Sequence, residues 1–463
     1  MRRISPLIAV VLAAVVLTGV AYRPAHSAEP PSGPNIVLVL TDDQRWDSLW
    51  AMPSVRRDLI DRGVTFSNAF VVNSLCCPSR TSILTGQYSH STGVYTNTPP
   101  HGGFSVFDDS STIATRLHDA GYRTALMGKY LNGYARFTNG SYVPPGWDQW
   151  AAFNSRGVTY YNYEMSIDGH LRSFGGDPAS YSTDVLANQA VDFIRHTRSR
   201  PFFLYLAPSA PHGPATPASR DVGTFSDLAP WRPASYNEAD VSDKPKWVQG
   251  KRRLGPARRA SIDTFAQHQY ESLQAVDDAV GAIVEELRAS GRLQDTMIVF
   301  MSDNGYLYGE HRLTGKQAPY EESIRVPLVI RYDPVTAASP GIRDDRLALN
   351  IDLAPTFADV AGTSMPGAEG RSLLPVLSGT APLWRSRFLV EHLHGQMPTY
   401  CAVRDTRFAY VRYATGDEEL YDLESDPSEL ENVAGDPSYG FVLSAERASL
   451  AELCSPPPPG YSP

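Results

Sequence analysis

The 463-residue sequence predicts an α/β protein in which helices cover both faces of a mostly parallel β-sheet, followed by a small antiparallel-sheet subdomain. Several apolar, β-branched runs are continuous rather than alternating, which is typical of strands buried on both faces. Amphipathic segments separate these runs, as expected for repeated βαβ units with right-handed crossovers. After about residue 385 the runs become short and alternate in polarity, which predicts hairpins.

The first region contains five predicted strands and four predicted helices. We expect the strands over residues 35–40, 122–127, 202–206, 297–301 and 327–330. We expect the helices over residues 54–62, 111–120, 183–195 and 261–289. Gly63, Gly121 and Gly291 follow three of these helices, and Pro201 follows the fourth, as is common where helices end. Residues 214–256 are rich in Pro, Asp, Arg and Trp without clear periodicity, which predicts a long lid or substrate loop.

The C-terminal region predicts four strands, a closing helix and a tail. We expect the strands over residues 388–392, 399–403, 408–413 and 419–422, and the helix over 446–453. The expected domains are a catalytic domain over 33–375, a C-terminal subdomain over 385–455 and a Pro-rich, extended tail over 456–463.

Residues 1–28 resemble a secretory signal peptide. Arg2 and Arg3 precede an apolar run over residues 4–20, and small residues suited to cleavage follow at 25–28. The alternative is an uncleaved membrane anchor, because the run is nearly long enough to cross a bilayer. We expect cleavage, a secreted or extracytoplasmic protein, and no stable membrane span in the mature chain.

Charge and cysteine content exclude two classes of protein. Four cysteines in 463 residues cannot make a disulfide scaffold. A formal net charge of −9 argues against general binding to nucleic acid. An anionic ligand must therefore be held by a local cationic site. Cys401 and Cys454 lie in the C-terminal region of an exported chain, so we expect them to form a disulfide.

Four of the predicted strands end in residues suited to chemistry. The residues that follow them are Asp42 and Asp43, then Lys129, then His212, then Asp303 and Asn304. If these strands are parallel, all of these groups meet at one edge of the sheet, where ligands bind in such folds. The carboxylates and the amide form an all-oxygen set suited to a hard cation.

Residues 76–86 read Cys-Cys-Pro-Ser-Arg-Thr-Ser-Ile-Leu-Thr-Gly. They match the sulfatase signature Cys-x-Pro-Ser-Arg-x-x-x-Leu-Thr-Gly at every fixed position. Further stretches that resemble sulfatases are 41–43, 128–132, 210–214, 302–306, 316–327 and 421–437. The chain is thus identified as a member of the sulfatase family, and the resemblance implies an alkaline-phosphatase-like fold. It is most similar to the N-acetylglucosamine-6-sulfatases and the extracellular heparan 6-O-endosulfatases.

The resemblance implies a modified nucleophile and a metal ion. In the family a separate maturation enzyme oxidises the signature cysteine, here Cys76, to formylglycine, whose hydrated aldehyde attacks sulfur. The neighbouring Cys77 is then a packed apolar residue. The metal is Ca²⁺, held by Asp42, Asp43, Asp303 and Asn304, with the modified Cys76 and the substrate sulfate completing its shell.

The resemblance also assigns the cationic groups. Arg80 binds the hydrated aldehyde or nearby carboxylates, Lys129 and Lys316 bind the sulfate, and His212 lies near the leaving oxygen. His212 and Lys316 are the candidates for protonating the leaving alcohol.

Two positions depart from the family pattern. Many sulfatases have His where this chain has Leu131, so Asn132 is a candidate to fill that part of the substrate site. The related group tends to have His where this chain has Leu307, and His311 is the candidate that compensates.

The expected function is secreted hydrolysis of sulfate esters, with 6-O-sulfated N-acetylglucosamine, free or in a glycan, as the substrate. One alternative is the same apparatus acting on an arylsulfate, another sugar sulfate, or a phosphonate or phosphate ester. An alternative of another class is an inactive relative that binds glycans.

Overall fold

The computed structural model describes residues 33–155, 157–381 and 383–462, so the predicted signal peptide lies outside the described residues. A ten-stranded sheet forms its centre, in the order β13-β2-β12-β9-β1-β8-β4-β5-β6-β7. The strands are β1 (Asn35–Thr41), β2 (Val64–Phe66), β4 (Arg123–Gly128), β5 (Gln149–Phe153), β6 (Tyr163–Ile167), β7 (His170–Phe174), β8 (Phe202–Ala207), β9 (Thr296–Ser302), β12 (Leu328–Tyr332) and β13 (Ile342–Asp344).

The middle of this sheet is parallel, as predicted. Strands β9, β1, β8, β4 and β5 run in the same direction. Strand β12 is antiparallel to both of its neighbours, and β6 and β7 extend the opposite edge as an antiparallel hairpin. The four strands expected to end in functional residues all belong to the parallel part, so their carboxyl ends share one edge.

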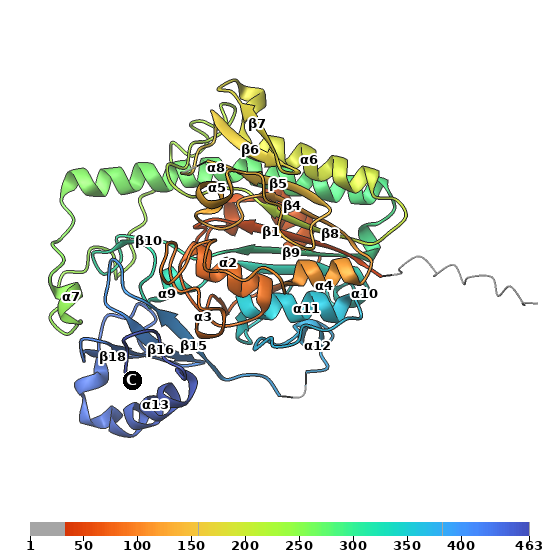
Figure 1. The fold of residues 1–463 in the computed structure, drawn as a ribbon. Coiled ribbons are helices and arrows are strands. Elements are labelled where there is room, and N and C mark those ends of the chain that lie inside the picture. The colour runs from red at the N-terminus through yellow and green to blue at the C-terminus, as the bar shows by residue number, and fades with distance from the viewer. Residues whose placement is uncertain (1–32, 156, 382, 463) are drawn as a thin grey trace, which may run out of the picture.

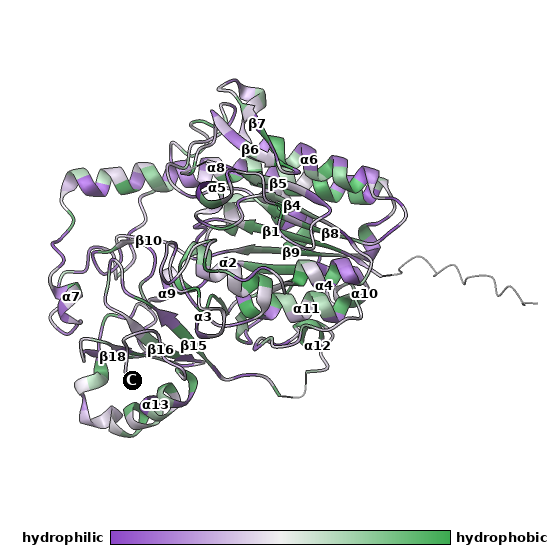
Figure 2. Ribbon diagram, in the orientation of Figure 1, coloured by the Kyte–Doolittle hydropathy of each residue, from purple (hydrophilic) through white to green (hydrophobic). Residues whose placement is uncertain are grey.

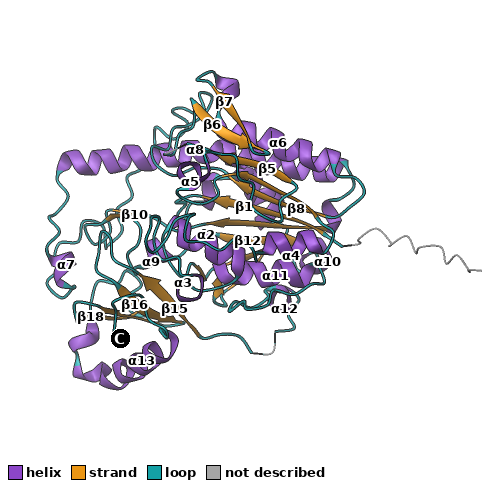
Figure 3. Cartoon of the chain, in the orientation of Figure 1, coloured by secondary structure: helices purple, strands orange, loops and turns teal. Residues whose placement is uncertain are grey.

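Helices cover both faces of the sheet (Figures 1 and 3). One layer contains α6 (Ser182–His196) and α8 (Pro256–Ala289), and the other contains α2 (Cys76–Thr85), α4 (Ile113–Asp119) and α11 (Leu353–Val360). Shorter elements are α1 (Pro53–Val55), α3 (Ser89–Thr92), α5 (Tyr134–Thr138), α7 (Lys246–Gln249), α9 (Glu321–Ile324), α10 (Asp333–Thr336), α12 (Leu374–Leu377) and the pairs β10 (Leu307–Tyr308) with β11 (Thr314–Gly315) and β3 (Ala69–Phe70) with β14 (Ala348–Leu349).

Strand β1 is apolar from Ile36 to Leu40 because both of its faces are covered. Val37 and Val39 pack in the core beneath α6 and α8, whereas Ile36, Leu38 and Leu40 pack in the core of the α4 and α11 layer. Successive side chains of a strand point to opposite faces, so a strand covered on both sides needs apolar residues at every position. The hydropathy colouring shows the apolar strands between two half-polar helix layers (Figure 2).

Three predicted helix boundaries were wrong. Instead of a helix over 54–62, α1 ends at Val55 and one π-helical turn, Arg56–Ile60, follows. The Asp277 carboxylate accepts hydrogen bonds from the backbone N–H groups of Ser54 and Val55 and so fixes this start. Helix α8 begins at Pro256, earlier than predicted, because its first turn is exposed and lacks the apolar periodicity used to find it. Helix α13 (Gly440–Leu453) also begins earlier than predicted, and Val442 and Leu443 of its first turn pack against the C-terminal sheet.

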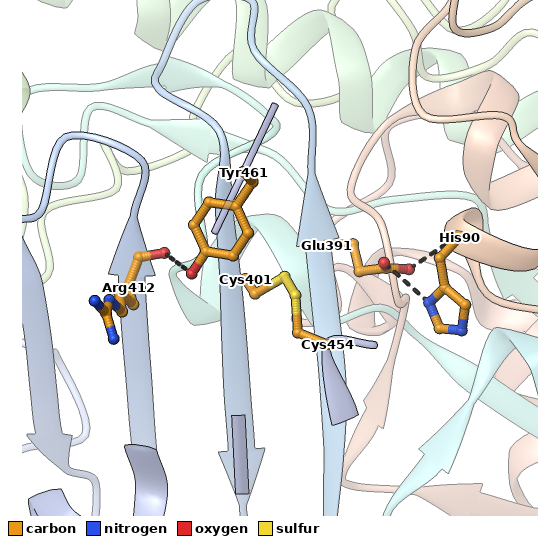
Figure 4. Close-up of a disulfide and its surroundings, with 6 residues drawn as sticks. All are labelled: His90, Glu391, Cys401, Arg412, Cys454 and Tyr461. Atoms are coloured by element: carbon orange, nitrogen blue, oxygen red, sulfur yellow. Dashed lines mark hydrogen bonds and ion pairs between the residues drawn. A yellow bond between two sulfur atoms is a disulfide. The ribbon is translucent and has the colours of Figure 1, made fainter. Parts of the chain in front are cut away.

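The C-terminal region forms a separate four-stranded antiparallel sheet, as predicted. Its strands are β15 (Arg387–His392), β16 (Tyr400–Asp405), β17 (Phe408–Tyr413) and β18 (Glu418–Asp422), with α13 packed against them. A disulfide joins Cys401 of β16 to Cys454 at the end of α13 (Figure 4). The Pro-rich tail lies against this sheet, where the Tyr461 ring is buried and its hydroxyl donates to the Arg412 carbonyl at 3.1 Å.

None of the described helices is both long enough and apolar enough to cross a membrane.

Candidate active site at the carboxyl edge of the parallel sheet

The residues that follow the parallel strands meet at one edge of the sheet. The backbone N–H of Asp43, after β1, donates to Asp303 Oδ1, after β9, at 3.2 Å. The Asn304 amide donates to Asp43 Oδ1 at 2.6 Å. The ring nitrogen Nε2 of His212, after β8, lies 3.7 Å from Asp43 Oδ2. The convergence that parallel strands imply is therefore present.

Two backbone conformations bring these groups so close. Asp43 adopts a left-handed conformation, with φ of +67°, at the turn out of β1. Gly128, the last residue of β4, has φ of +114°, and a Cβ atom there would lie 2.0 Å from the Ala207 carbonyl oxygen. Only glycine allows this approach of β4 to β8, which places Lys129 at the edge. Strained backbone of this kind is common at functional sites.

Helix α2 presents Cys76 and Arg80 to the same edge. The two residues are four apart and lie on one face of the helix. Arg80 is fully buried, and its Nε donates to Asp303 Oδ2 at 2.8 Å while its Nη1 donates to the Lys129 carbonyl at 2.8 Å. Its Nη2 is 3.7 Å from Asp42 Oδ2. Arg80 therefore ties the loops after β1, β4 and β9 together.

Cys76 lies between an acidic and a basic group. Its sulfur is 3.5 Å from Asp42 Oδ1 and 2.7 Å from the Lys316 ammonium. Burial raises the pKa of the Cys76 thiol to about 11, although Lys129 and Lys316 oppose the shift. The side chain is thus a neutral thiol at neutral pH, which is a weak nucleophile.

The charges of the site compensate one another. The Lys129 ammonium contacts Asp42, and that of Lys316 contacts Asp43. Burial alone would raise the pKa of Asp42, but Lys129, His212, Arg80 and Lys316 outweigh burial and hold the pKa well below its usual range. Burial and the nearby Asp42 raise the pKa of Asp303. Burial opposes charge on both lysines, yet the carboxylates raise the pKa of each.

The donor set fits a divalent cation. One ligand atom from each of Asp42, Asp43, Cys76 and His212 lies within 4.8 Å of the others. The side-chain oxygen of Asn304 is buried and has no hydrogen-bond partner among the described residues. Carboxylates together with an amide oxygen are the ligands that hard cations such as Ca²⁺ prefer. The cluster thus contains Asp42 and Asp43 of the expected set together with Cys76 and His212, whereas the two oxygens of Asp303 accept from the Asp43 N–H and from Arg80, so the full oxygen set stays a prediction.

A small cavity of about 110 Å³ opens beside Lys129. Asn132 and Ser209 line it, and the side-chain oxygen of Asn132 is buried without a hydrogen-bond partner in the described part of the chain. His212 lies on this side of the site, and its Nδ1 donates to the Gly213 carbonyl at 2.7 Å. That hydrogen bond leaves His212 Nε2 facing the carboxylates.

The structure does not bring His311 to this cluster. Its ring is fully buried, its Nδ1 is 2.7 Å from Glu238 Oε2, and it stacks on Tyr320 with ring centroids 4.1 Å apart. These contacts belong to a buried network beneath the C-terminal sheet. They place His311 away from the carboxylates, and its expected compensation for Leu307 stays a prediction.

Sequence reasoning did not single out Gln269 of α8, although it supports the site. Its amide donates to the Pro211 carbonyl at 2.9 Å and to the Asp43 carbonyl at 3.4 Å, which fixes the loops after β8 and β1. A signal existed, because Gln269 lies four residues from Phe265 and from Leu273, on the apolar stripe of the helix. A buried polar residue in such a stripe needs partners, here two backbone carbonyls.

Comparison with known proteins identifies the family. The sulfatase family profile matches residues 34–363, and the profile described as N-sulphoglucosamine sulphohydrolase, C-terminal, matches residues 309–455. The chain is 33% identical to the human N-acetylglucosamine-6-sulfatase over 92% of its own length and 85% of that protein. It is 37% identical to the Drosophila melanogaster extracellular sulfatase SULF-1 homolog over 77% of its own length. The chain spans only 33% of the Drosophila protein and 54% of a similar Caenorhabditis elegans protein.

Solved structures agree in fold. One, described as a complex with its substrate D-glucosamine-2-N,6-O-disulfate, has a TM-score of 0.80 and 25% identity, and covers 92% of this chain and 98% of its own. A phosphonate monoester hydrolase of Agrobacterium radiobacter has a TM-score of 0.73 at 22% identity, covering 91% and 96%, a likeness of fold alone. With the signature helix, the carboxylates and the two lysines at one sheet edge, this chain belongs to the sulfatase family of sulfuric ester hydrolases.

Proposed function

We propose that this protein is an exported sulfatase that hydrolyses 6-O-sulfate esters of N-acetylglucosamine in glycans. The observation that carries the proposal is the placement of Lys129 and Lys316 on either side of Cys76 and the carboxylates. Two ammonium groups there form a local anion site in a chain with a net charge of −9. Curated relatives that cover most of this chain are named N-acetylglucosamine-6-sulfatases, which supports the choice of sugar.

The neutral thiol of Cys76 supports its conversion to formylglycine by a maturation enzyme. Attack on a sulfate ester needs a strong nucleophile, and a buried thiol with a pKa of about 11 does not supply one. Oxidation of Cys76 to the aldehyde would supply a hydrate hydroxyl as nucleophile, next to Lys316. Arg80 holds Asp303 and Asp42 in place, so the surroundings of Cys76 are rigid before substrate arrives.

The remaining side chains bind the sulfate and assist departure of the alcohol. Asp42, Asp43, Asp303 and Asn304 would hold Ca²⁺, which supplies Lewis-acid polarisation of the sulfate. Lys129 and Lys316, which contact Asp42 and Asp43, would bind the sulfate oxygens. His212, whose Nδ1 donates to the Gly213 carbonyl, is the candidate proton donor to the leaving oxygen through Nε2.

Mass spectrometry of the peptide spanning Cys76, combined with a substrate panel, tests the proposal. We expect the aldehyde in active protein, and higher kcat/KM for N-acetylglucosamine-6-sulfate than for other sugar sulfates, aryl sulfates and phosphonate monoesters. An unmodified thiol in fully active protein would refute the mechanism. A clear preference for a phosphonate monoester over every sulfate would refute the reaction class.

A further inference from the structure

A basic segment, residues 246–259, crosses from α7 to the first turn of α8. Its fourteen residues contain six cationic side chains and neither Asp nor Glu, in a chain whose formal net charge is −9. The six are Lys246, Lys251, Arg252, Arg253, Arg258 and Arg259. Long runs of one sign without counter-charges create a local potential that attracts the opposite charge.

The charges of this segment are not neutralised within the described structure. No carboxylate oxygen of the described residues lies within 4.0 Å of any of the six cationic groups. Arg312 adds a seventh such charge. Its guanidinium donates to three backbone carbonyls, those of Glu238 at 2.9 Å, Lys251 at 3.1 Å and Ala239 at 2.8 Å, and to no carboxylate. These bonds fix the guanidinium, which forms no ion pair with a carboxylate of the described residues.

Two of these cationic residues share a cavity with an active-site lysine. Lys251, Arg312 and Lys316 line one cavity of about 150 Å³, together with Trp247 and Gln396, and no acidic residue lines it. Lys316 is the same side chain that contacts Asp43 and Cys76. In the first turn of α8, Arg258 Nη2 donates to Thr314 Oγ1 at 2.9 Å. This hydrogen bond joins the start of α8 to Thr314, which lies two residues before Lys316. A continuous cationic path therefore leads from the surface to the sulfate site.

Five of the six cationic side chains of the basic segment are exposed, all except Lys251. The N-terminal part of α8 projects beyond the sheet, and α7 lies below it on the side of β10 (Figure 1). Much of this projecting part is hydrophilic (Figure 2). The Lys251 ammonium lies 5.8 Å from the centre of the Trp247 ring, so an aromatic face accompanies the charge. Sulfated sugars present both anionic groups and apolar faces.

We infer that the basic segment and Arg312 form a docking surface for a polyanionic glycan whose scissile sulfate lies at Lys316. The preferred form of the proposed substrate is then a 6-O-sulfated N-acetylglucosamine within a sugar chain that carries further sulfate or carboxylate groups. A single sulfate needs only Lys129 and Lys316, whereas seven further unpaired cations complement repeated charges. The inference rests on the proposed function, because it places the cleaved ester of that chain at the same site.

The experiment compares two triple variants with equal change in net charge. The test variant is Lys251→Gln, Arg252→Gln, Arg253→Gln. The control is Arg62→Gln, Arg198→Gln, Arg343→Gln, which removes three exposed arginines without a described ion pair elsewhere. We measure the salt concentration that elutes each from immobilised heparin, and KM and kcat for a sulfated oligosaccharide and a small aryl sulfate.

We expect the test variant to elute at lower salt than the wild type and the control. We expect its KM for the oligosaccharide to rise by about ten-fold, with kcat for the aryl sulfate unchanged. Equal elution and equal KM in both variants would overturn the inference while leaving sulfate hydrolysis intact. Equal retention of the wild type on heparin and on single-stranded DNA of matched charge, with no change in the oligosaccharide KM of the test variant, would also overturn it. A wild-type protein that binds heparin but hydrolyses no sulfate ester would refute the proposed function alone.

Discussion

The ammonium nitrogen of Lys316 lies 2.7 Å from the sulfur of Cys76, although the two residues are 240 positions apart in the chain. Lys316 also contacts Asp43, so one side chain joins the nucleophile position to the expected metal ligands. A positive charge held here acts directly on whatever anion is bound next to residue 76.

Lys316→Met should therefore lower kcat by roughly 10²–10³-fold, the usual effect of removing one preorganised donor to developing negative charge. Steady-state kinetics with an aryl sulfate, with thermal melting to verify folding, measure this. Arg343→Met is the control, because this exposed arginine makes no ion pair with described residues. A Lys316→Met enzyme with kcat within a factor of about two of the control would contradict the assigned role.

Replacing His212 should affect poor leaving groups most. His212→Gln removes the side chain whose Nε2 faces Asp43 and the site. Protonation of the leaving oxygen matters more for a sugar alcohol than for a phenol, because the phenolate leaves readily without a proton. We expect kcat to fall about 10²-fold for a sugar sulfate and less for a nitrophenyl sulfate. Equal losses for both esters would show that His212 does not serve as the proton donor.

Removal of the metal should lower both activity and stability. The buried Asn304 oxygen lacks a partner among the described residues, and the amide nitrogen of the same side chain donates to Asp43, whose own N–H donates to Asp303. Without a cation the negative charges of the carboxylates are less well compensated, so a chelator should lower Tm as well as abolish turnover. We expect added Ca²⁺ to restore both, and Asp303→Asn to show reduced calcium dependence of Tm. A chelated enzyme with unchanged Tm and activity would disprove the metal site.

His90 should make stability depend on alkaline pH. Its Nδ1 is 3.0 Å from Glu391 Oε1 on β15, and its Nε2 is 3.2 Å from Glu369 Oε1 (Figure 4 shows the Glu391 contact). Burial disfavours the charged ring, but the two carboxylates outweigh burial and raise the pKa of His90 from 6.5 to about 10. The charged ring therefore binds the helix α3 region of the catalytic domain to the C-terminal sheet.

The sign of the effect follows from that shift. The folded state binds the proton more tightly than the unfolded state, so the stabilisation is complete below pH 6.5 and is lost as pH rises through about 10. We expect the difference in Tm between wild type and His90→Gln to be largest below pH 6.5 and to shrink toward pH 10. Melting curves across this range measure it, and a pH-independent difference would contradict the ion pair.

The disulfide should stabilise the C-terminal subdomain. Cys401 and Cys454 are 53 residues apart, and closing a loop of that length stabilises a fold by roughly 4 kcal/mol in the chain-entropy model. We expect the double variant Cys401→Ser, Cys454→Ser to lower Tm and to expose the segment after β15 to protease first. Limited proteolysis with mass spectrometry locates the cleavage. A double variant with the same Tm as the oxidised wild type would show that the disulfide contributes little to stability.

The strands that carry the site, and the residues at their ends, could be predicted from the amino-acid sequence. The apolar runs before Asp42, Lys129, His212 and Asp303 identified buried strands because strands covered on both faces need apolar residues at every position. The signature around Cys76 supplied the family resemblance. The pairing of Cys401 with Cys454 was expected from their position in the C-terminal region of a chain predicted to be exported, and the structure contains that disulfide.

Contacts between side chains that are distant in the sequence depend on tertiary packing and could not be predicted from the sequence. Nothing local to Lys316 indicates contact with Cys76, and the helix position of Gln269 does not reveal the two carbonyls it binds. His311 follows a loop pattern typical of the family, yet packing against Tyr320 and Glu238 turns it away from the carboxylates. The charges of Lys251 and Arg312 were visible as residue types. Their significance depends on the absence of carboxylate partners among the described residues and on a shared cavity with Lys316, which are properties of the folded chain.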